Sequence, residues 1–295
     1  MLFRSLAIGA KARIFVAFDP DAALEEYDRH STFVFLVPSM LALVAEARRA
    51  AAPRYDGGLA ALRMMLSSGA PGPMSLLEEA FDIFPNATIA EAYGWTEGGW
   101  VTFEAKQRGA LEPHSVGWPM IGSDIAVVDP DDPDRRVAVG EAGEVVARSV
   151  VPFLGYLGRP EATAAALTSD GFVRSGDVGI QLPDGRLTIV DRVKDMIISG
   201  GENVYCAEVE RILLEHPAVL EAAVVGLADP TWGERVVGAV VARGSLEVDA
   251  DQMIAFCRER LAHYKCPKQI VVVTELPRNP MGKVQKFRLI EALLA

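Results

Sequence analysis

The sequence predicts an α/β fold made of a large α/β and β-rich part and a small α+β part. In the first third, strand-like apolar runs alternate with helical segments, which indicates a parallel sheet with helices packed on it. After about Val116 the strands become short and are divided by Gly, Pro and Asp, which indicates a barrel-like subdomain. After Lys194 the pattern is that of a compact α+β unit. We therefore predict one domain over residues 1–191, with an α/β part (1–115) and a β-rich part (116–191), and a second over 192–295.

The first third is predicted to hold four strands with helices between them. Asp19-Pro20-Asp21 opens the first helix. Pro38 stands at the start of the second helix and Pro73 at the start of the third, where a missing backbone N–H costs nothing. The third helix is expected to run through Phe84. The predicted strands are Ile14–Phe18, Phe33–Leu36, Leu62–Leu66 and Thr88–Ala92.

The β-rich part is predicted to hold five short strands. Asp184-Gly185 is a strong hairpin turn between the last two, because both residues tolerate positive φ. The predicted strands are Asp124–Val128, Glu144–Arg148, Phe172–Arg174, Ile180–Leu182 and Leu187–Val190.

The last third is predicted to hold three helices and three strands. Asp249 caps the middle helix, which runs through Leu261, and Gln252 is placed to reach back as in a capping box. The other predicted elements are the helices Ala207–Glu215 and Phe287–Leu294 and the strands Val219–Val225, Val236–Val241 and Ile270–Val273.

Charge and cysteine usage narrow the class of protein. The net charge of −11 over 295 residues argues against nucleic-acid binding, but it does not exclude ATP or CoA, because phosphate sites are local features. Phe33–Ala45, the longest apolar stretch, is too short to span a bilayer. The three cysteines have no metal-ligand spacing, so we expect reduced, buried thiols in a cytoplasmic protein.

Two turns follow predicted strands, at the end of the sheet where open α/β folds bind ligands. In the first, Tyr93-Gly94-Trp95-Thr96-Glu97, the glycine permits a tight turn, Thr96 offers a hydroxyl to phosphate, and Glu97 offers a carboxylate to Mg²⁺. In the second, Ser68-Gly69-Ala70-Pro71, small residues let a flat base lie against the backbone. For both, an ordinary polar turn is the alternative.

Three further segments contain residues suited to nucleotide chemistry. Asp177, at the end of a predicted strand, could accept hydrogen bonds from both ribose hydroxyls, although an Asx turn explains it equally well. In the run Asp191–Val204, the pair Gly200-Gly201 between an apolar strand and a helix permits close backbone approach by a ligand. Near the end, a proline-rich loop presents Lys283, whose ammonium suits a phosphate or carboxylate oxygen; a solvated basic tail is the alternative.

In this order and spacing, five segments resemble core motifs of the adenylate-forming (AMP-binding) superfamily of acyl-CoA synthetases, peptide-synthetase adenylation domains and luciferases. The resemblance is to an acyl-CoA synthetase of the fatty-acid–CoA ligase type. It covers nearly the whole chain. The segments are YGWTE (93–97), GYLGRPEAT (155–163), RSGDVG (174–179), VDRVKDMIISGGENVYCAEVE (190–210) and PRNPMGKVQK (277–286).

The resemblance implies a remnant of a large N-terminal domain followed by a small C-terminal domain, with ATP, Mg²⁺ and CoA as cofactors and a small carboxylic acid as substrate. Lys283 would bridge the carboxylate and the α-phosphate, and Lys194 would be the hinge between the domains. Asp177 and Arg192 would hold the ribose, and Gly200 and Gly201 would line the pantetheine channel. The residues implied for adenine, phosphates and metal are Gly69, Ala70, Pro71, Tyr93, Gly94, Thr96 and Glu97, with Glu97 on Mg²⁺.

The implied reaction has two steps, in which the protein positions reactants and stabilises charge. A carboxylate attacks the α-phosphate of ATP to give acyl-AMP and pyrophosphate, and the CoA thiol then displaces AMP. A fatty or other apolar or aromatic acid is expected; Trp95 and Trp100 hint at an apolar or aromatic one, with a packing role as the alternative. Two other readings remain: a non-catalytic homologue that binds nucleotide, CoA or a partner, and a peptide-synthetase adenylation domain.

The family also has a Ser/Thr/Gly-rich phosphate loop that ends in Pro-Lys-Gly, and the 295 residues contain no such segment. Without its cradle of backbone N–H groups the pyrophosphate loses a binding site, so we expect the chain as given to be inactive. Leu2-Phe3-Arg4-Ser5 is what the sequencing-adapter end CTCTTCCGATCT encodes, so we also expect an incomplete gene with native sequence from near Leu6.

Overall fold

The computed structural model of the chain describes residues 9–14, 16–55, 57–70, 72–151, 153–244, 246–279 and 284–294. The chain forms two compact units. Unit 1 comprises Met1–Tyr93 and Glu104–Pro113, and unit 2 comprises Gly94–Phe103 and His114–Ala295. The domain boundary predicted near Asp191–Lys194 lies within unit 2 and stays a prediction. The adapter-like residues 2–5 lie outside the described residues.

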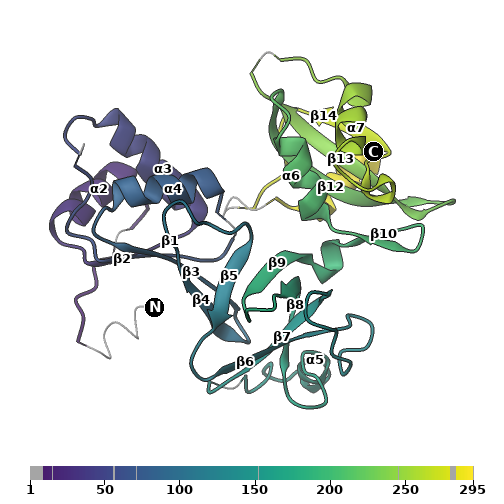
Figure 1. Cartoon of the computed structure of the whole chain (residues 1–295), viewed down its shortest axis with the longest axis horizontal. Helices are drawn as coiled ribbons and strands as arrows, with labels where there is room; N and C mark the ends of the chain where they lie inside the picture. Colours follow the sequence, from purple (N-terminus) through teal and green to yellow (C-terminus); the bar gives the residue numbers. More distant parts are fainter. Residues whose placement is uncertain are drawn as a thin grey trace. The chain divides into compact units, whose positions relative to one another are not determined.

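Within its described residues, unit 1 places the helices α2, α3 and α4 on the parallel strands β1, β2 and β3 (Figure 1). Strand β2 lies between β1 and β3, and Leu66 is paired with Phe35 on one side and Ala90 on the other. Fully buried side chains from both layers, including Leu36, Leu41 and Ile83, form one core. The elements are α2 (Pro20–Arg29), β1 (Phe33–Leu36), α3 (Pro38–Ala50), β2 (Met64–Ser67), α4 (Met74–Ile83) and β3 (Thr88–Trp95), whose last two residues belong to unit 2.

The sequence predicted most of unit 1, with one error. The α/β class is confirmed, β1 has the predicted bounds, and Pro38 is the first residue of α3. The predicted strand Ile14–Phe18 is wrong: no strand includes its described residues, and Ile14 and Val16 are exposed. An isolated apolar run lacks a neighbour for its backbone hydrogen bonds, and the described part of the chain pairs β1 with β2 alone.

The first part of unit 2 is an antiparallel sheet with strand order β4-β5-β9-β8-β7-β6. Asp184 and Gly185 form the predicted hairpin turn between β8 and β9, with Gly185 at φ 87°. The strands are β4 (Gly99–Ala105, whose last two residues belong to unit 1), β5 (Ser115–Pro119), β6 (Ser123–Val128), β7 (Ala142–Ser149), β8 (Val173–Gln181) and β9 (Leu187–Arg192), and the sheet is accompanied by helix α5 (Pro160–Ala165).

The two strands predicted over Phe172–Arg174 and Ile180–Leu182 are one strand, β8. Gly176 has φ 70° but does not end the strand. The pairing with β7 shifts register between Glu144 and Val146 instead, so the glycine is accommodated at a β-bulge. The segment Ser175–Asp177 therefore lies within a strand and not after one.

The last part of unit 2 is the predicted small α+β arrangement (Figure 1). Val224, Val236 and Val240 pack in one core with α6 and α7. The neighbouring residues of the same strands, including Ala223 and Val237, join a second core with α8, because successive side chains point to opposite faces. The elements are η1 (Val193–Asp195), β10 (Ile197–Ser199), β11 (Glu202–Val204), α6 (Cys206–Leu214), β12 (Val219–Asp229), β13 (Gly233–Ala242), α7 (Ala250–Arg258), η2 (His263–Lys265), β14 (Gln269–Val273) and α8 (Lys286–Leu294).

In this part, some local predictions from the sequence are confirmed and one helix end is corrected. The Asp249 side chain caps α7 by accepting from the backbone N–H of Gln252 at 2.9 Å, but α7 ends at Arg258 and not at Leu261. The three cysteines are free and buried, as predicted. No helix within the described ranges combines the length and apolar character that crossing a membrane requires.

Candidate active site

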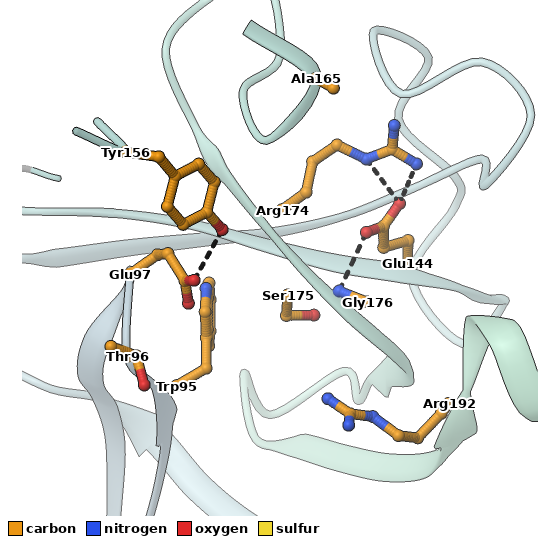
Figure 2. Close-up of a pocket in the computed structure, with 10 residues that line it drawn as sticks. All are labelled: Trp95, Thr96, Glu97, Glu144, Tyr156, Ala165, Arg174, Ser175, Gly176 and Arg192. Carbon is orange, nitrogen blue, oxygen red and sulfur yellow. Dashed lines mark hydrogen bonds and ion pairs between the residues drawn. The ribbon is translucent and has the colours of Figure 1, made fainter. Parts of the chain in front are cut away.

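Unit 2 contains an open cavity of about 560 Å³ next to strands β8 and β9 (Figure 2). Its lining is rich in charged and hydroxyl groups, and the volume is within the range of small-molecule sites. The lining residues are Trp95, Thr96, Glu97, Glu144, Tyr156, Ala165, Arg174, Ser175, Gly176 and Arg192.

One wall comes from the connection between β3 and β4. Strand β3 extends to Trp95, so Thr96 and Glu97 lie in the turn that follows. Gly94 is required here by close approach, because a Cβ at this position would lie 1.8 Å from the carbonyl oxygen of Gly99. The strand thus ends three residues beyond its predicted end at Ala92, and of the predicted turn Tyr93–Glu97 only Thr96 and Glu97 lie in a turn.

Glu97 is held by Tyr156, which the sequence placed in the Gly155-Tyr156 segment without a site role. The phenol donates a hydrogen bond to Glu97 Oε1 at 2.6 Å (Figure 2). This hydrogen bond to the carboxylate raises the pKa of Tyr156, so the phenol is neutral at physiological pH. The contact orients a carboxylate at the rim of the cavity.

A second wall is built on a buried ion pair between β7 and β8. Arg174 donates through Nε and Nη2 to Glu144 Oε2 at 2.9 and 2.6 Å, and the backbone N–H of Gly176 donates to Glu144 Oε1 at 3.0 Å. The Glu144 side chain is 3% exposed. Both carboxylate oxygens are thus engaged, and the bulge at Gly176 is tied to β7. Sequence reasoning missed Glu144 and Arg174 because only strand pairing brings residues 30 positions apart together.

Asp177 and Arg192 are directly opposite each other in the β8–β9 register. Arg192 Nε donates to Asp177 Oδ1 at 2.7 Å, and the aspartate side chain is 13% exposed against 36% for the arginine. The structure therefore brings together the two residues that the sequence assigned to the ribose, and Arg192 also lines the cavity (Figure 2).

The neighbouring Asp191 has a different function. Its Oδ1 accepts from the backbone N–H of Arg192 at 2.8 Å, and its Oδ2 accepts from the backbone N–H of Ala207 at 3.2 Å. Ala207 is the second residue of α6, so Asp191 binds one of the N–H groups that a helix start leaves without an intrahelical partner. Burial raises the pKa of Asp191.

The remaining predicted residues lie elsewhere. Gly69 and Ala70 are exposed after β2, and Tyr93 is in β3, all three in unit 1. Lys194 is exposed in η1. Gly200 and Gly201 form the exposed turn of the β10–β11 hairpin, with φ 63° and 83°, and not a loop between strand and helix as predicted. Pro71 and Lys283 lie outside the described residues.

Family models match most of the chain. The AMP-binding enzyme model matches residues 1–157, and the AMP-binding enzyme C-terminal domain model matches residues 208–283. The chain belongs to the AMP-binding enzyme family. Within it, the chain is of the adenylate-forming acyl-CoA synthetase type.

Individual relatives agree with this assignment. The chain is 39% identical over 285 residues to a feruloyl-CoA synthase of Amycolatopsis, covering 96% of this chain and 56% of the relative. It is 38% identical to a 2-succinylbenzoate–CoA ligase of Geobacillus kaustophilus, covering 97% and 56%. The structure resembles ATP-bound MatB from Rhodopseudomonas palustris with a TM-score of 0.85 and 31% identity, covering 98% of this chain and 56% of that one. The chain thus spans about half the length of the relatives it matches.

The cavity of this AMP-binding protein can be tested against the metal that the family implies. The described residues include no group of three or more His, Cys, Asp or Glu side chains that could hold a metal ion. Mg²⁺ does not require such a cage, because it commonly keeps several waters and binds one or two carboxylates together with substrate phosphates. Glu97, oriented at the rim by Tyr156, fits the part of a single protein ligand.

Proposed function

We propose that this chain is part of a carboxylic acid–CoA ligase that forms acyl-AMP and then acyl-CoA. The observation that supports this most strongly is the cavity of unit 2, which is lined by Thr96, Glu97 and Arg192, with Asp177 behind it as the hydrogen-bond partner of Arg192. Thr96 and Glu97 would bind the phosphates, and Asp177 and Arg192 the ribose. Lys283 would bridge the carboxylate and the α-phosphate, as its position in the family motif implies.

The charges of the cavity suit this use. Arg174 is neutralised by the buried Glu144, so this pair shapes the wall and adds little net charge to it. Glu97 accepts a hydrogen bond from the phenol of Tyr156, and this hydrogen bond raises the pKa of Tyr156. Bound Mg²⁺ would supply the positive charge that lets a carboxylate and a triphosphate lie together. Gly200 and Gly201, at an exposed tip, would meet the pantetheine arm, with Lys194 as the hinge.

For the substrate we propose an aromatic carboxylic acid, with a fatty acid as the wider class. Two of the relatives that match with 38–39% identity are named for feruloyl and 2-succinylbenzoate groups, and two others at the same identity for an octahydroindenyl propanoyl group and for 2-methylpropanoate. Trp95 offers an aromatic surface in the cavity lining. We place the reaction in the cytoplasm, in keeping with three free, buried thiols.

The test has two stages, both with the 295-residue chain. Calorimetry with AMP measures nucleotide binding, and the Asp177→Asn variant is expected to weaken it by about tenfold, since charge-assisted hydrogen bonds are the strong ones. ATP–pyrophosphate exchange with a panel of aromatic and fatty acids then measures adenylation. Absence of AMP binding by the parent chain would count against the assignment of the cavity.

The second candidate is a protein that binds nucleotide without adenylating. It is favoured by one observation, the lack of a Ser/Thr/Gly-rich segment ending in Pro-Lys-Gly among the 295 residues. Such a protein would bind AMP and lose affinity in the Asp177→Asn variant, but it would show no acid-dependent pyrophosphate exchange. Acid-dependent exchange by the 295-residue chain would therefore exclude this second candidate.

A further inference from the structure

Unit 1 contains a buried cluster of three charged side chains that the proposed reaction does not use. Lys106 Nζ contacts Glu91 Oε2 at 2.9 Å and also contacts the carboxylate of Glu104. The side chains of Lys106, Glu91 and Glu104 are 2%, 14% and 9% exposed. Burial raises the pKa of Glu91. Because removing three charges from water is costly, such a cluster calls for a reason other than stability.

The Glu91 carboxylate reaches a loop that follows a different strand. Glu91 is opposite Ser67, the last residue of β2, in the β2–β3 register. Its carboxylate accepts a hydrogen bond from the backbone N–H of Gly72, five residues beyond Ser67. Glu91 Oε1 lies 3.8 Å from where a Cβ of Gly72 would stand, while Oε2 is on Lys106. One carboxylate thus connects Gly72 to a fixed, buried cation.

Among the described residues, the segment Ser67–Ala70 has few other attachments. The hydroxyl of Ser67 is buried and has no hydrogen-bond partner among the described residues. Gly69 has φ 94° and, like Ala70, is exposed. Gly69 would meet only a methyl group of Val37 within 4 Å of its Cβ position. At the far end of the segment, Leu77 Cγ lies 3.6 Å from where a Cβ of Gly72 would stand, and Glu91 adds a polar attachment through the Gly72 N–H.

We propose that Glu91, held by Lys106, is a positioning residue for nucleotide binding: it fixes Gly72 and with it the backbone of Ser68–Ala70. The inference rests on the proposed function and on the family resemblance, which implies that Gly69 and Ala70 lie against the adenine. A flat base packs on backbone only if that backbone keeps one conformation, so the cost of the buried charges is offset by preorganisation of the loop.

Four variants test the proposal. Glu91→Leu removes the acceptor for Gly72, and Lys106→Met releases the carboxylate that makes the contact. Glu91→Gln keeps an acceptor oxygen of similar reach. Glu104→Leu is the matched control, because Glu104 shares the buried Lys106 but has no contact with Gly72 among those described.

Two measurements apply to each variant: the AMP dissociation constant by calorimetry, and hydrogen exchange of peptides covering residues 67–73 without nucleotide. Glu91→Leu and Lys106→Met are expected to weaken AMP binding about tenfold and to speed exchange of the Gly72 amide by at least that factor. Glu91→Gln is expected to stay within about threefold of the parent on both. Glu104→Leu is expected to lower the melting temperature while leaving both measurements near the parent.

The outcomes are distinguishable. Equal loss of AMP affinity in Glu91→Leu and Glu104→Leu would overturn the proposal, because the cluster would then act only through stability. Unchanged exchange of the loop in Glu91→Leu would overturn it as well. If Glu91→Leu does not fold, failure of Glu91→Gln to retain loop protection takes its place as the refuting result. A parent chain that binds no AMP would refute the proposed function, while loop exchange would still decide whether Glu91 fixes Gly72.

Discussion

The ion pair between Lys286 of α8 and Glu210 of α6 permits a quantitative prediction. Lys286 Nζ lies 2.9 Å from Glu210 Oε1, and the two side chains are 19% and 22% exposed. Glu210 also accepts from the backbone N–H of Val224 in β12 at 2.8 Å, so its charge lies where three elements meet. The anionic partners raise the pKa of Lys286 well above its usual value despite burial, so the ammonium is charged at all physiological pH.

The magnitude follows from geometry and burial. At 2.9 Å, Coulomb attraction with an effective dielectric constant of ~20 is about 6 kcal/mol, most of which desolvation offsets. Breaking a fully buried pair costs about 3–5 kcal/mol, and the partial exposure of both groups lowers this to about 2–3 kcal/mol. Lys286→Met keeps the aliphatic stem but leaves Glu210 without its counter-ion. We expect the opening free energy of α6 and β12 to fall by that amount.

Native-state hydrogen exchange of peptides from α6 and β12 measures this free energy, and the expected loss corresponds to an increase in exchange rate of about 30–160-fold. The control is a double-mutant cycle with Glu210→Gln, which keeps an acceptor for Val224 while removing the charge. The double variant is expected to be more stable than Lys286→Met alone, with a coupling of about 1.5 kcal/mol or more. A coupling below about 0.5 kcal/mol would refute the reasoning.

Three further predictions concern a glycine, a helix cap and a thiol. Gly94→Ala is expected to lower the melting temperature and weaken AMP binding, because the new Cβ would lie 1.8 Å from a backbone oxygen. Gly57→Ala is the control, because a Cβ there meets nothing within 4 Å. Equal effects of the two substitutions would contradict the prediction. Asp249→Ala should cost about 1 kcal/mol in urea unfolding through loss of the α7 cap, and Asp251→Ala, in the first turn but not the cap, much less. Burial raises the pKa of Cys206 to about 12, so the stability it contributes is complete below its unfolded pKa and is lost as pH rises towards 12. The unfolding free energy should therefore differ less between pH 7 and pH 10 in Cys206→Ala than in the parent chain. An equal difference in both proteins would argue against the raised pKa of Cys206.

Local chemistry made some elements predictable. Pro38 could be read as a helix start because proline lacks the N–H that a first turn leaves unused, and Asp184-Gly185 as a hairpin because a glycine accepts φ 87°. Gly176 misled the same reasoning. A glycine with positive φ can end a strand or sit in a bulge, and the choice depends on the partner strand, here β7.

The site shows the same division between local and long-range information. Asp177 and Arg192 could be paired from motifs, although their 2.7 Å contact depends on the β8–β9 register. Glu144 stands in no motif, and its importance arises from burial beside Arg174 and from the Gly176 N–H, both set by strand pairing. Gly200-Gly201 could be recognised as special but not as a hairpin turn, because β10 and β11 are three residues each and leave too short a pattern.

The end of β9 serves two structures at once. Successive residues of a strand point to opposite sides, so Arg192 turns to Asp177 and the cavity while Asp191 turns to the start of α6. A rotation at Lys194, the predicted hinge, would leave the Asp177–Arg192 pair intact, because both residues precede it. The same rotation would break the contact of Asp191 with Ala207, because Ala207 follows Lys194 in the chain. The Asp191 carboxylate, which is already costly to bury, would then need a hydrogen bond from water or from another donor. Solvation of Asp191 would then offset part of the lost hydrogen bond, so the burial that raises its pKa would make this contact less costly to break.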